Sequence, residues 1–318
     1  MFAANSFYPA TKTMELFNEC IERDQGASYR VWLGKVLPHI EDAYRAGDGG
    51  FRTHLGVSLI GDECSAKLFY GWRWTKKPKF NGQTLRLFNR GHLEEGRFVA
   101  LILASGMQIV QQDETGGQYR VSYLGGHFGS AIDGVVIGCP DMPNPSTPIL
   151  TEMKTHNDNS FKKLKTAGVK ESKWEHYVQQ QEYMLYYGLP ASLYIAVNKN
   201  TDEIWCEIVP FDRETAERYK DRGHIIALSE APPPKLSQDR SFYKCKWCDY
   251  RGICHMGDMP EVNCRTCKHS YPLEDGTWRC GLQVAAAASY ITDGSEGILD
   301  KEAQLAACAN YEPADYYG

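Results

Sequence analysis

The sequence has no apolar run that approaches the roughly 18 residues needed to cross a bilayer. Its first ten residues also lack the basic and apolar segments of a secretory signal peptide. Both absences predict a cytoplasmic protein without a membrane partner, located in the host cytoplasm if the chain is viral. The motif G-x4-G-K-[ST] of helicases and other nucleotide hydrolases is absent as well.

Positive charge is also in short supply. The 318 residues include 35 lysines and arginines against 40 acidic residues, which gives a net charge of −5. Proteins that coat nucleic acid without regard to sequence are usually basic, so any such contact here must rely on local basic patches. The composition is otherwise that of an ordinary globular protein, with 42% hydrophobic and 24% charged residues.

The pattern of apolar residues predicts an α/β fold. Helices are expected within 58–74 and at 85–110, 173–187 and 213–229, and strands at 119–124, 131–138, 149–155, 192–198 and 203–209. This order favours a mixed central sheet flanked by helices, with a hairpin turn at 199–202. The chain is expected to divide into an N-terminal helical segment (1–55), a core (56–257) and a small cysteine-rich C-terminal module (258–318).

The first chemical motif is the predicted strand ILTEMKT at residues 149–155. Side chains alternate along a strand, so Glu152 and Lys154 project from one face and Met153 from the other. A carboxylate beside an ammonium at the end of a strand can bind a divalent metal and hold a water next to it. Alone, the pair is also typical of a surface ion pair.

Three further motifs accompany this strand. Asp133 ends the run Gly-Ser-Ala-Ile-Asp before a glycine, where Asp-Gly can also be a simple turn. His92 and Glu95 lie on one face of a predicted helix, a face that can also be solvated. Gln179 and Tyr183 share a face of a later helix, where they either position a phosphate or the attacking water, or belong to an ordinary amphipathic helix.

The motifs G-H-x-x-E, G-x-x-D-G, E-x-K and Q-x-x-x-Y, in this order over roughly residues 58–255, resemble the RecB-type branch of the PD-(D/E)XK nucleases. The resemblance implies a restriction-endonuclease-like core. Its catalytic residues would be Asp133, Glu152, Lys154, Gln179 and Tyr183. Its ligands for Mg²⁺ or Mn²⁺ would be His92, Glu95, Asp133, Glu152 and the backbone carbonyl of Met153. Lys154 would orient or deprotonate the attacking water.

The activity implied by the resemblance is a metal-dependent DNA exonuclease that hydrolyses phosphodiester bonds from DNA ends, in phage or bacterial recombination, repair or DNA degradation. The missing helicase motif favours a stand-alone enzyme, for which a recombination or annealing protein would be a fitting partner. The alternatives are a structure-specific or CRISPR-adaptation-type endonuclease and a catalytically silent DNA-binding scaffold. Intact Asp133, Glu152 and Lys154 argue against the scaffold.

Two basic stretches are candidates for contact with DNA phosphates, although both are also compatible with a solvated surface. The first stretch alternates with the aromatic residues Trp72, Trp74 and Phe80, and the second follows the E-x-K strand. The candidate residues are Arg73, Lys76, Lys77 and Lys79 in the first stretch and Lys162, Lys163, Lys165 and Lys173 in the second.

Eleven cysteines remain to be explained, and in a reducing compartment clustered cysteines are more often metal ligands than disulfide partners. Cys245, Cys248 and Cys254 form a C-x2-C-x5-C motif that needs a fourth ligand. With Cys64, which precedes the nuclease motifs, the triplet resembles the iron–sulfur nucleases of the AddB and CRISPR-adaptation type. That resemblance implies a 4Fe–4S cluster. The alternative is zinc held by the triplet and His255.

A second group of cysteines lies in the C-terminal module. Structural zinc is usually bound by four ligands in a tetrahedron, and a bound zinc lets a short segment fold without a large core. The predicted zinc ligands are Cys264, Cys267, Cys280 and Cys308, with His269 as an alternative fourth ligand. The remaining cysteines, Cys20, Cys139 and Cys206, are expected to be ordinary buried residues.

Overall fold

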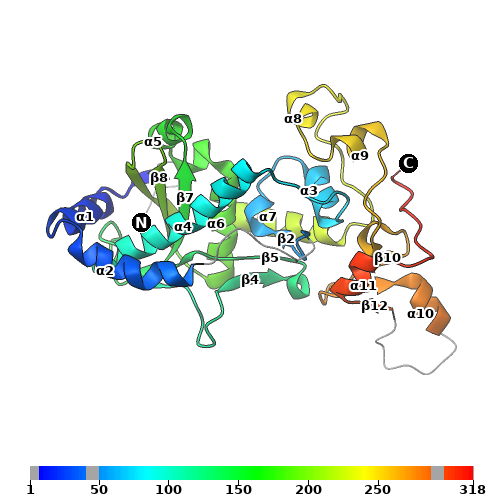
Figure 1. Cartoon of the computed structure of the whole chain (residues 1–318), viewed down its shortest axis with the longest axis horizontal. Helices are drawn as coiled ribbons and strands as arrows, with labels where there is room; N and C mark the ends of the chain where they lie inside the picture. Colours follow the sequence, from blue (N-terminus) through cyan, green and yellow to red (C-terminus); the bar gives the residue numbers. More distant parts are fainter. Residues whose placement is uncertain (1–6, 41–49, 288–296, 318) are drawn as a thin grey trace. The chain divides into compact units, whose positions relative to one another are not determined.

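The computed structural model describes residues 7–40, 50–287 and 297–317 (Figure 1). Part of the expected N-terminal helical segment, residues 1–6 and 41–49, therefore lies outside the described residues. The chain forms two compact units, each built from separate stretches of sequence. Unit 1 comprises Met1–Ala46, Phe80–Val121 and Ala131–Arg218, and unit 2 comprises Gly47–Lys79, Ser122–Ser130 and Tyr219–Gly318. This division differs from the three consecutive ranges expected from the sequence.

Unit 1 is built on a mixed six-stranded sheet, as predicted. Its strands, in spatial order, are β1 (Tyr8–Pro9), β9 (Ile204–Pro210), β8 (Ala191–Asn198), β7 (Ile149–His156), β6 (Gly134–Ile137) and β3 (Gln108–Val110). The central pair β7–β8 is parallel, and the other pairs are antiparallel. The parallel pair needs a crossover connection, and two helices between β7 and β8 supply it.

Helices cover both faces of this sheet (Figure 1). The first set is α1 (Thr11–Glu22), α2 (Ala27–Val36) and α4 (Gly82–Ala104), and the second is α5 (Asp158–Ser172) and α6 (Trp174–Tyr187). Strand β8 is buried on both faces: Leu193 and Ile195 belong to the core under α1 and α4, whereas Tyr194 and Ala196 belong to the core under α5. This alternation decides which β7 side chains share a face with Tyr194.

Two elements of unit 1 differ from expectation. The helix predicted at 85–110 ends at Ala104, because Gly106 adopts a positive φ of 90° and the chain continues as β3 beside β6. Helix α5 was not predicted, since its sequence was interpreted only as a basic stretch. The Asn157 side chain caps this helix by accepting a hydrogen bond from the Ser160 N–H at 2.9 Å.

The core beneath α5 contains a buried carboxyl group. Glu207 on β9 is 2% exposed and accepts hydrogen bonds from the Val169 N–H at 3.0 Å and from the Trp205 indole at 3.4 Å. Burial raises the pKa of Glu207 to about 7, although the two donors act in the opposite direction. The folded protein therefore holds this proton more tightly than the unfolded chain does.

This raised pKa predicts a pH-dependent stability. The contribution of Glu207 is fully present below its ordinary pKa of 4.5 and is lost as the pH rises through about 7. Glu207→Gln stays neutral, so its stability relative to wild type should rise by about 3 kcal/mol across that window. Urea denaturation of both proteins near pH 5 and near pH 8 measures the change, and an identical difference at both pH values would contradict it.

Unit 2 combines short helices with a three-stranded antiparallel sheet. Its elements include β2 (Leu55–Gly56), α3 (Ser65–Trp72), β5 (Phe128–Ala131), α8 (Tyr243–Lys246), α9 (Arg251–Met256), β10 (Ser270–Pro272), β11 (Trp278–Cys280), α10 (Gly281–Ala287), β12 (Ile298–Leu299) and α11 (Lys301–Ala306). The chain enters unit 2 along β4 (Arg120–Tyr123) and again along α7 (Arg213–Leu228). No helix in the described part of the chain is long and apolar enough to cross a membrane.

A buried arginine lies at the centre of unit 2. Arg265 is 3% exposed, and its guanidinium lies 4.2 Å from the ring centre of Trp72, 3.9 Å from that of Trp74 and 4.7 Å from that of Trp278. It also donates hydrogen bonds to the carbonyls of Trp72 and Thr53, at 3.2 and 3.0 Å. Residues 258–318 are thus packed together with residues 47–79 in one unit.

Candidate metal centre and cysteine sites

The E-x-K strand and the predicted Asp133 strand are neighbours in the sheet of unit 1. Gly134 at the start of β6 pairs with Thr151 on β7. Asp133, directly before β6, accepts a hydrogen bond from the Met153 N–H at 2.7 Å. Asp133 is therefore fixed against the strand that carries Glu152 and Lys154.

Glu152 is the most buried carboxylate of this group, with no exposed surface. Its Oε1 accepts a hydrogen bond from the Lys154 ammonium, and its Oε2 is buried without a hydrogen-bond partner in the described part of the chain. The pKa of Glu152 is raised to about 7. Burial is the main cause and outweighs the Lys154 charge, which lowers the pKa, while the Asp133 charge also raises it. An unpartnered buried carboxylate oxygen is costly, and a bound cation would satisfy it.

Helix α4 brings a third carboxylate to this point. Gln111 donates to the Glu95 Oε1 at 3.4 Å and to the Asp133 carbonyl at 2.9 Å, so both residues lie beside the same amide. The pKa of Glu95 is raised to about 8. Burial is the main cause, the negative charges of Asp133 and Glu152 act in the same direction, and Lys154 acts against them. His92 lies one turn earlier on α4 and is not among the groups that shift this pKa.

Lys154 lies among these carboxylates. Burial lowers the pKa of the Lys154 ammonium, but the charges of Glu152, Asp133 and Glu95 outweigh burial and raise it above its ordinary value. Lys154 is therefore a stable cation at neutral pH.

The carboxylates match the chemistry of a divalent metal site. Mg²⁺ and Mn²⁺ prefer oxygen ligands, and Asp133, Glu152 and Glu95 provide carboxylates that repel one another in the absence of a cation. Among the described residues, no three His, Cys, Asp or Glu side chains lie close enough to one another to hold a metal ion. The Lys154 ammonium bonds the Glu152 Oε1 and leaves the Oε2 for a cation. The donor set therefore fits a divalent cation, with side-chain rearrangement on binding.

Gln179 and Tyr183, predicted near the attacking water, are both buried on α6. The Gln179 side-chain amide donates to the Tyr183 hydroxyl at 2.9 Å. The predicted shared helix face is therefore real, and it points into the protein.

A buried hydrogen-bonded triad next to Lys154 escaped the sequence analysis. The Tyr194 hydroxyl on β8 joins the His156 Nε2 at 2.9 Å and the His176 Nδ1 at 2.8 Å. Burial lowers the pKa of His156 to about 4 and that of His176 to about 2, and the Lys154 charge lowers both. Both rings are thus neutral. Strand alternation could have found His156, which follows Lys154 by two residues.

The predicted DNA-contacting residues of unit 2 are only partly on the surface. Arg73 is 2% exposed, donates to the Ser229 carbonyl at 2.5 Å and lies over the rings of Phe69 and Trp278. It therefore cannot reach a phosphate, and the expectation for this residue is corrected. Exposed side chains remain at Lys76, Lys77 and Lys79.

The lysines of α5 are exposed, but several have partners. Lys162 pairs with Asp158 at 2.7 Å, and Lys165 pairs with Glu203. Lys173, directly after α5, donates to the Ser160 Oγ at 2.6 Å, and this hydroxyl lies 3.1 Å from the His156 Nδ1. Burial lowers the pKa of Lys173, and the nearby charge of Lys163 lowers it as well.

The first cysteine group gathers within unit 2. Cys64 caps α3, and the segment of α8 and α9 packs against this region through the Lys244–Glu63 ion pair at 2.6 Å. Burial raises the pKa of the Cys254 thiol, and the charges of Cys64, Cys248 and Cys245 raise it further. The pKa of His255 is lowered mainly by burial. Lys235 and Arg251 lower it as well, and Asp239 raises it. No three of these side chains lie close enough to hold a metal ion in the described part of the chain, so the choice between Cys64 and His255 stays a prediction.

The second cysteine group also gathers within unit 2. The pKa of the Cys264 thiol is raised to about 11. Burial is the main cause, and the charges of Cys267, Cys308 and Cys280 act in the same direction. His269 bonds Glu312 at 3.2 Å. Cys308 and His269 both remain predicted fourth ligands, because no three of these side chains are close enough to hold a metal in the described residues. The three cysteines left over, Cys20, Cys139 and Cys206, are buried and free, as predicted.

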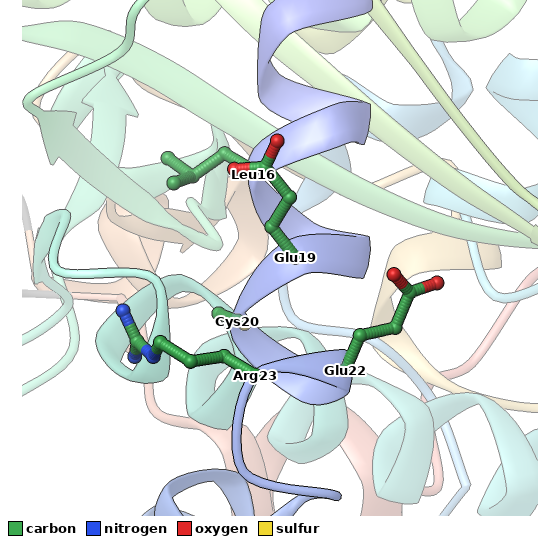
Figure 2. Close-up of a pocket in the computed structure, with 5 residues that line it drawn as sticks. All are labelled: Leu16, Glu19, Cys20, Glu22 and Arg23. Carbon is green, nitrogen blue, oxygen red and sulfur yellow. The ribbon is translucent and has the colours of Figure 1, made fainter.

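A surface hollow of about 470 Å³ lies along α1. Figure 2 labels the residues that line it: Leu16, Glu19, Cys20, Glu22 and Arg23. None of these residues belongs to the carboxylate group or to either cysteine group, so we assign the hollow no role in the chemistry.

No protein-family model matches the chain, and no curated protein matches it. Among solved structures, it is similar to an alkaline exonuclease from Laribacter hongkongensis, with 16% identity, coverage of 62% of this chain and 90% of that chain, and a TM-score of 0.39. The complex of that exonuclease with dAMP gives 15% identity, the same coverage and a TM-score of 0.38. The protein SSO0001 gives 11% identity, coverage of 72% and 95%, and a TM-score of 0.36. At this similarity, function has to be inferred from the site itself.

Proposed function

We propose that the chain is a metal-dependent deoxyribonuclease of the PD-(D/E)XK superfamily, in its RecB-type branch. The observation that carries the proposal is the buried Glu152, with one unpartnered oxygen, beside Asp133, Glu95 and Lys154. A fully buried Glu152 beside two half-buried carboxylates is costly for stability, so the group is better explained by a function. The order of the four sequence motifs supports the same assignment.

In this proposal Asp133, Glu152 and Glu95 hold Mg²⁺ or Mn²⁺, with the Met153 carbonyl as a further ligand by analogy with the superfamily. The bound cation would offset the charge of the phosphate and acidify the attacking water. His92, three residues before Glu95 on α4, would complete the ligand set.

Lys154 acts in this scheme as a hydrogen-bond donor. The surrounding carboxylates raise its pKa, so it carries its proton before a cation binds to them. Its ammonium orients the attacking water and stabilises the negative charge that develops on the phosphate. The carboxylates around it keep this charge in position.

Within this class we propose an exonuclease that acts on DNA ends, with a role in phage or bacterial recombination, repair or DNA degradation. The test is incubation of the protein with end-labelled linear duplex and with covalently closed circular DNA, with Mg²⁺, with Mn²⁺ and with neither. Metal-dependent loss of the linear DNA alone is expected. Cutting of the circle would indicate an endonuclease, and no cutting with either metal would overturn the proposal.

We further propose that the Tyr194 triad positions Lys154. Tyr194→Phe keeps the ring but removes the hydroxyl that joins His156 to His176, two rings that feel the Lys154 charge. Loss of such a supporting hydrogen bond should lower kcat about 10- to 100-fold and leave KM for DNA nearly unchanged. The control is Tyr177→Phe. Tyr177 lies next to His176 on α6, and the substitution removes only its hydrogen bond to Asp212. A rise in KM at constant kcat would contradict this role.

We propose two structural metal sites in unit 2: a 4Fe–4S cluster at Cys64, Cys245, Cys248 and Cys254, and zinc at Cys264, Cys267, Cys280 and Cys308. The mutual influence of the thiol charges within each group supports both sets. Four thiolates are the usual ligands of such clusters and are common at structural zinc sites.

The cluster predicts a visible colour. Protein purified without oxygen should be brown and contain roughly four irons per chain. Cys64→Ser should bleach it, whereas Cys20→Ser, which removes a buried thiol in unit 1, should leave the colour unchanged. Colourless wild-type protein with two zinc ions per chain would show that the triplet binds zinc instead.

A further inference from the structure

Two large aromatic side chains near the first cysteine group face solvent. Trp247 is 80% exposed and Tyr243 is 63% exposed, whereas Trp72, Trp74 and Trp278 of the same unit are at most 2% exposed. Both exposed rings belong to the short helix α8 and the residue that follows it. Tryptophan is normally well buried, so an isolated exposed ring of this size indicates a binding surface.

Each exposed ring is accompanied by a lysine. The Lys246 ammonium lies 5.2 Å from the centre of the Trp247 ring, and the Lys244 ammonium lies 5.8 Å from that of Tyr243. Residues 235–255 contain five lysines and arginines against two aspartates, in a chain whose net charge is −5. The region is therefore a local basic patch on an acidic protein, as nucleic-acid contact would require.

We propose that the aromatic-basic surface formed by Tyr243, Lys244, Lys246 and Trp247 binds single-stranded nucleic acid. Bases would stack on the two rings, and the lysines would contact the phosphates. A duplex hides the faces of its bases within its own stack, so this surface selects a single strand. Stacking tolerates every base, so we expect no sequence preference. The proposal rests on the proposed function only in its choice of DNA over RNA.

A protein partner is the competing occupant, because exposed aromatics also mark protein interfaces. The charges argue for nucleic acid: each ring has a lysine beside it, and the basic residues of the segment outnumber Asp239 and Asp249 even though Lys244 also pairs with Glu63. A strand of phosphates would neutralise this excess, whereas an apolar protein surface would have to bury it.

The surface is tested by fluorescence anisotropy with a labelled oligothymidylate of about 20 nucleotides, a length that covers the site sizes of small single-strand binders. The full chain carries Glu152→Gln and divalent metal is omitted, so that the probe is not cut. Trp247→Ala should weaken binding about tenfold or more, since one stacked base contributes roughly 1–3 kcal/mol. Trp247→Phe should recover part of the affinity. Ile225→Ala, which removes another exposed apolar side chain of unit 2, is the control and should bind normally.

Salt separates the two kinds of contact. Lys246→Ala should reduce the slope of log Kd against log salt by about 0.7, the value for one phosphate of a single strand, while Trp247→Ala leaves the slope unchanged. A matched oligouridylate that bound more tightly than oligothymidylate would reassign the strand to RNA. Equal affinity of wild type and Trp247→Ala for both oligonucleotides would overturn the proposal, as would a Trp247→Ala effect confined to oligomeric state in light scattering. Because no cleavage is measured, these outcomes are distinct from a failure of the nuclease proposal.

Discussion

Glu152→Gln is expected to lower the rate of DNA cleavage by about a thousandfold or more, while the protein stays folded. The substitution removes the charge of a carboxylate that is fully buried and carries an oxygen without a hydrogen-bond partner. It also removes the partner that keeps Lys154 in position. Asp133→Asn and Lys154→Ala should have effects of similar size, because the three groups act on the same phosphate.

Glu217→Gln is the matched control, since it neutralises a glutamate that pairs with Arg213 at 3.2 Å on the surface of α7. Exposed pairs of this kind contribute little to stability, and this one has no proposed role in cleavage. Initial rates on end-labelled linear DNA, at matched far-ultraviolet circular dichroism, measure the effect. Full activity in any two of the three site variants would remove the basis of the assignment.

Arg265→Ala is expected to destabilise unit 2 by about 3–5 kcal/mol. The substitution empties the space between Trp72, Trp74 and Trp278 and leaves the carbonyls of Trp72 and Thr53 without their buried donor. Arg265→Lys should recover little of this loss, because an ammonium cannot stack on rings or reproduce the planar guanidinium donors.

Limited proteolysis distinguishes this expectation from the sequence-based one. A C-terminal module that folded alone would expose new cleavage sites only after residue 258. The structure instead predicts new sites within 50–79 as well, because Asn263 donates to the Trp74 carbonyl at 3.0 Å and the Glu261 N–H donates to the Thr75 carbonyl at 2.9 Å. Arg213→Ala, at a surface ion pair, is the control. Cleavage of Arg265→Ala confined to residues after 258 would favour the separate module.

The E-x-K strand could be predicted from sequence because its information is local. Alternation along ILTEMKT fixes that Glu152 and Lys154 share a face, and a short connection makes the Asp133 strand its neighbour. The hairpin between β8 and β9 was equally local, and its turn contains Asp202 at a positive φ of 57°. These features depend on residues a few positions apart.

The features that were missed depend on contacts between distant segments. Tyr194 meets His156 and His176 only because β7 and β8 are parallel and α6 packs over them. A basic residue among tryptophans looked like a DNA contact, yet Arg73 is buried because the aromatic residues around it form the interior of unit 2. Arg265 was not singled out, because the carbonyls of Trp72 and Thr53 that it bonds lie about 200 residues earlier in the chain.

The most direct test of the central claim is an anomalous difference map from crystals grown with Mn²⁺. We predict a peak between the carboxylates of Asp133 and Glu152, with Glu95 turned toward it and the Lys154 ammonium released from the Glu152 Oε1. The same crystals of Glu152→Gln should lack that peak. Bound Mn²⁺ elsewhere in the molecule, with none at these carboxylates, would contradict the metal centre and the nuclease mechanism built on it.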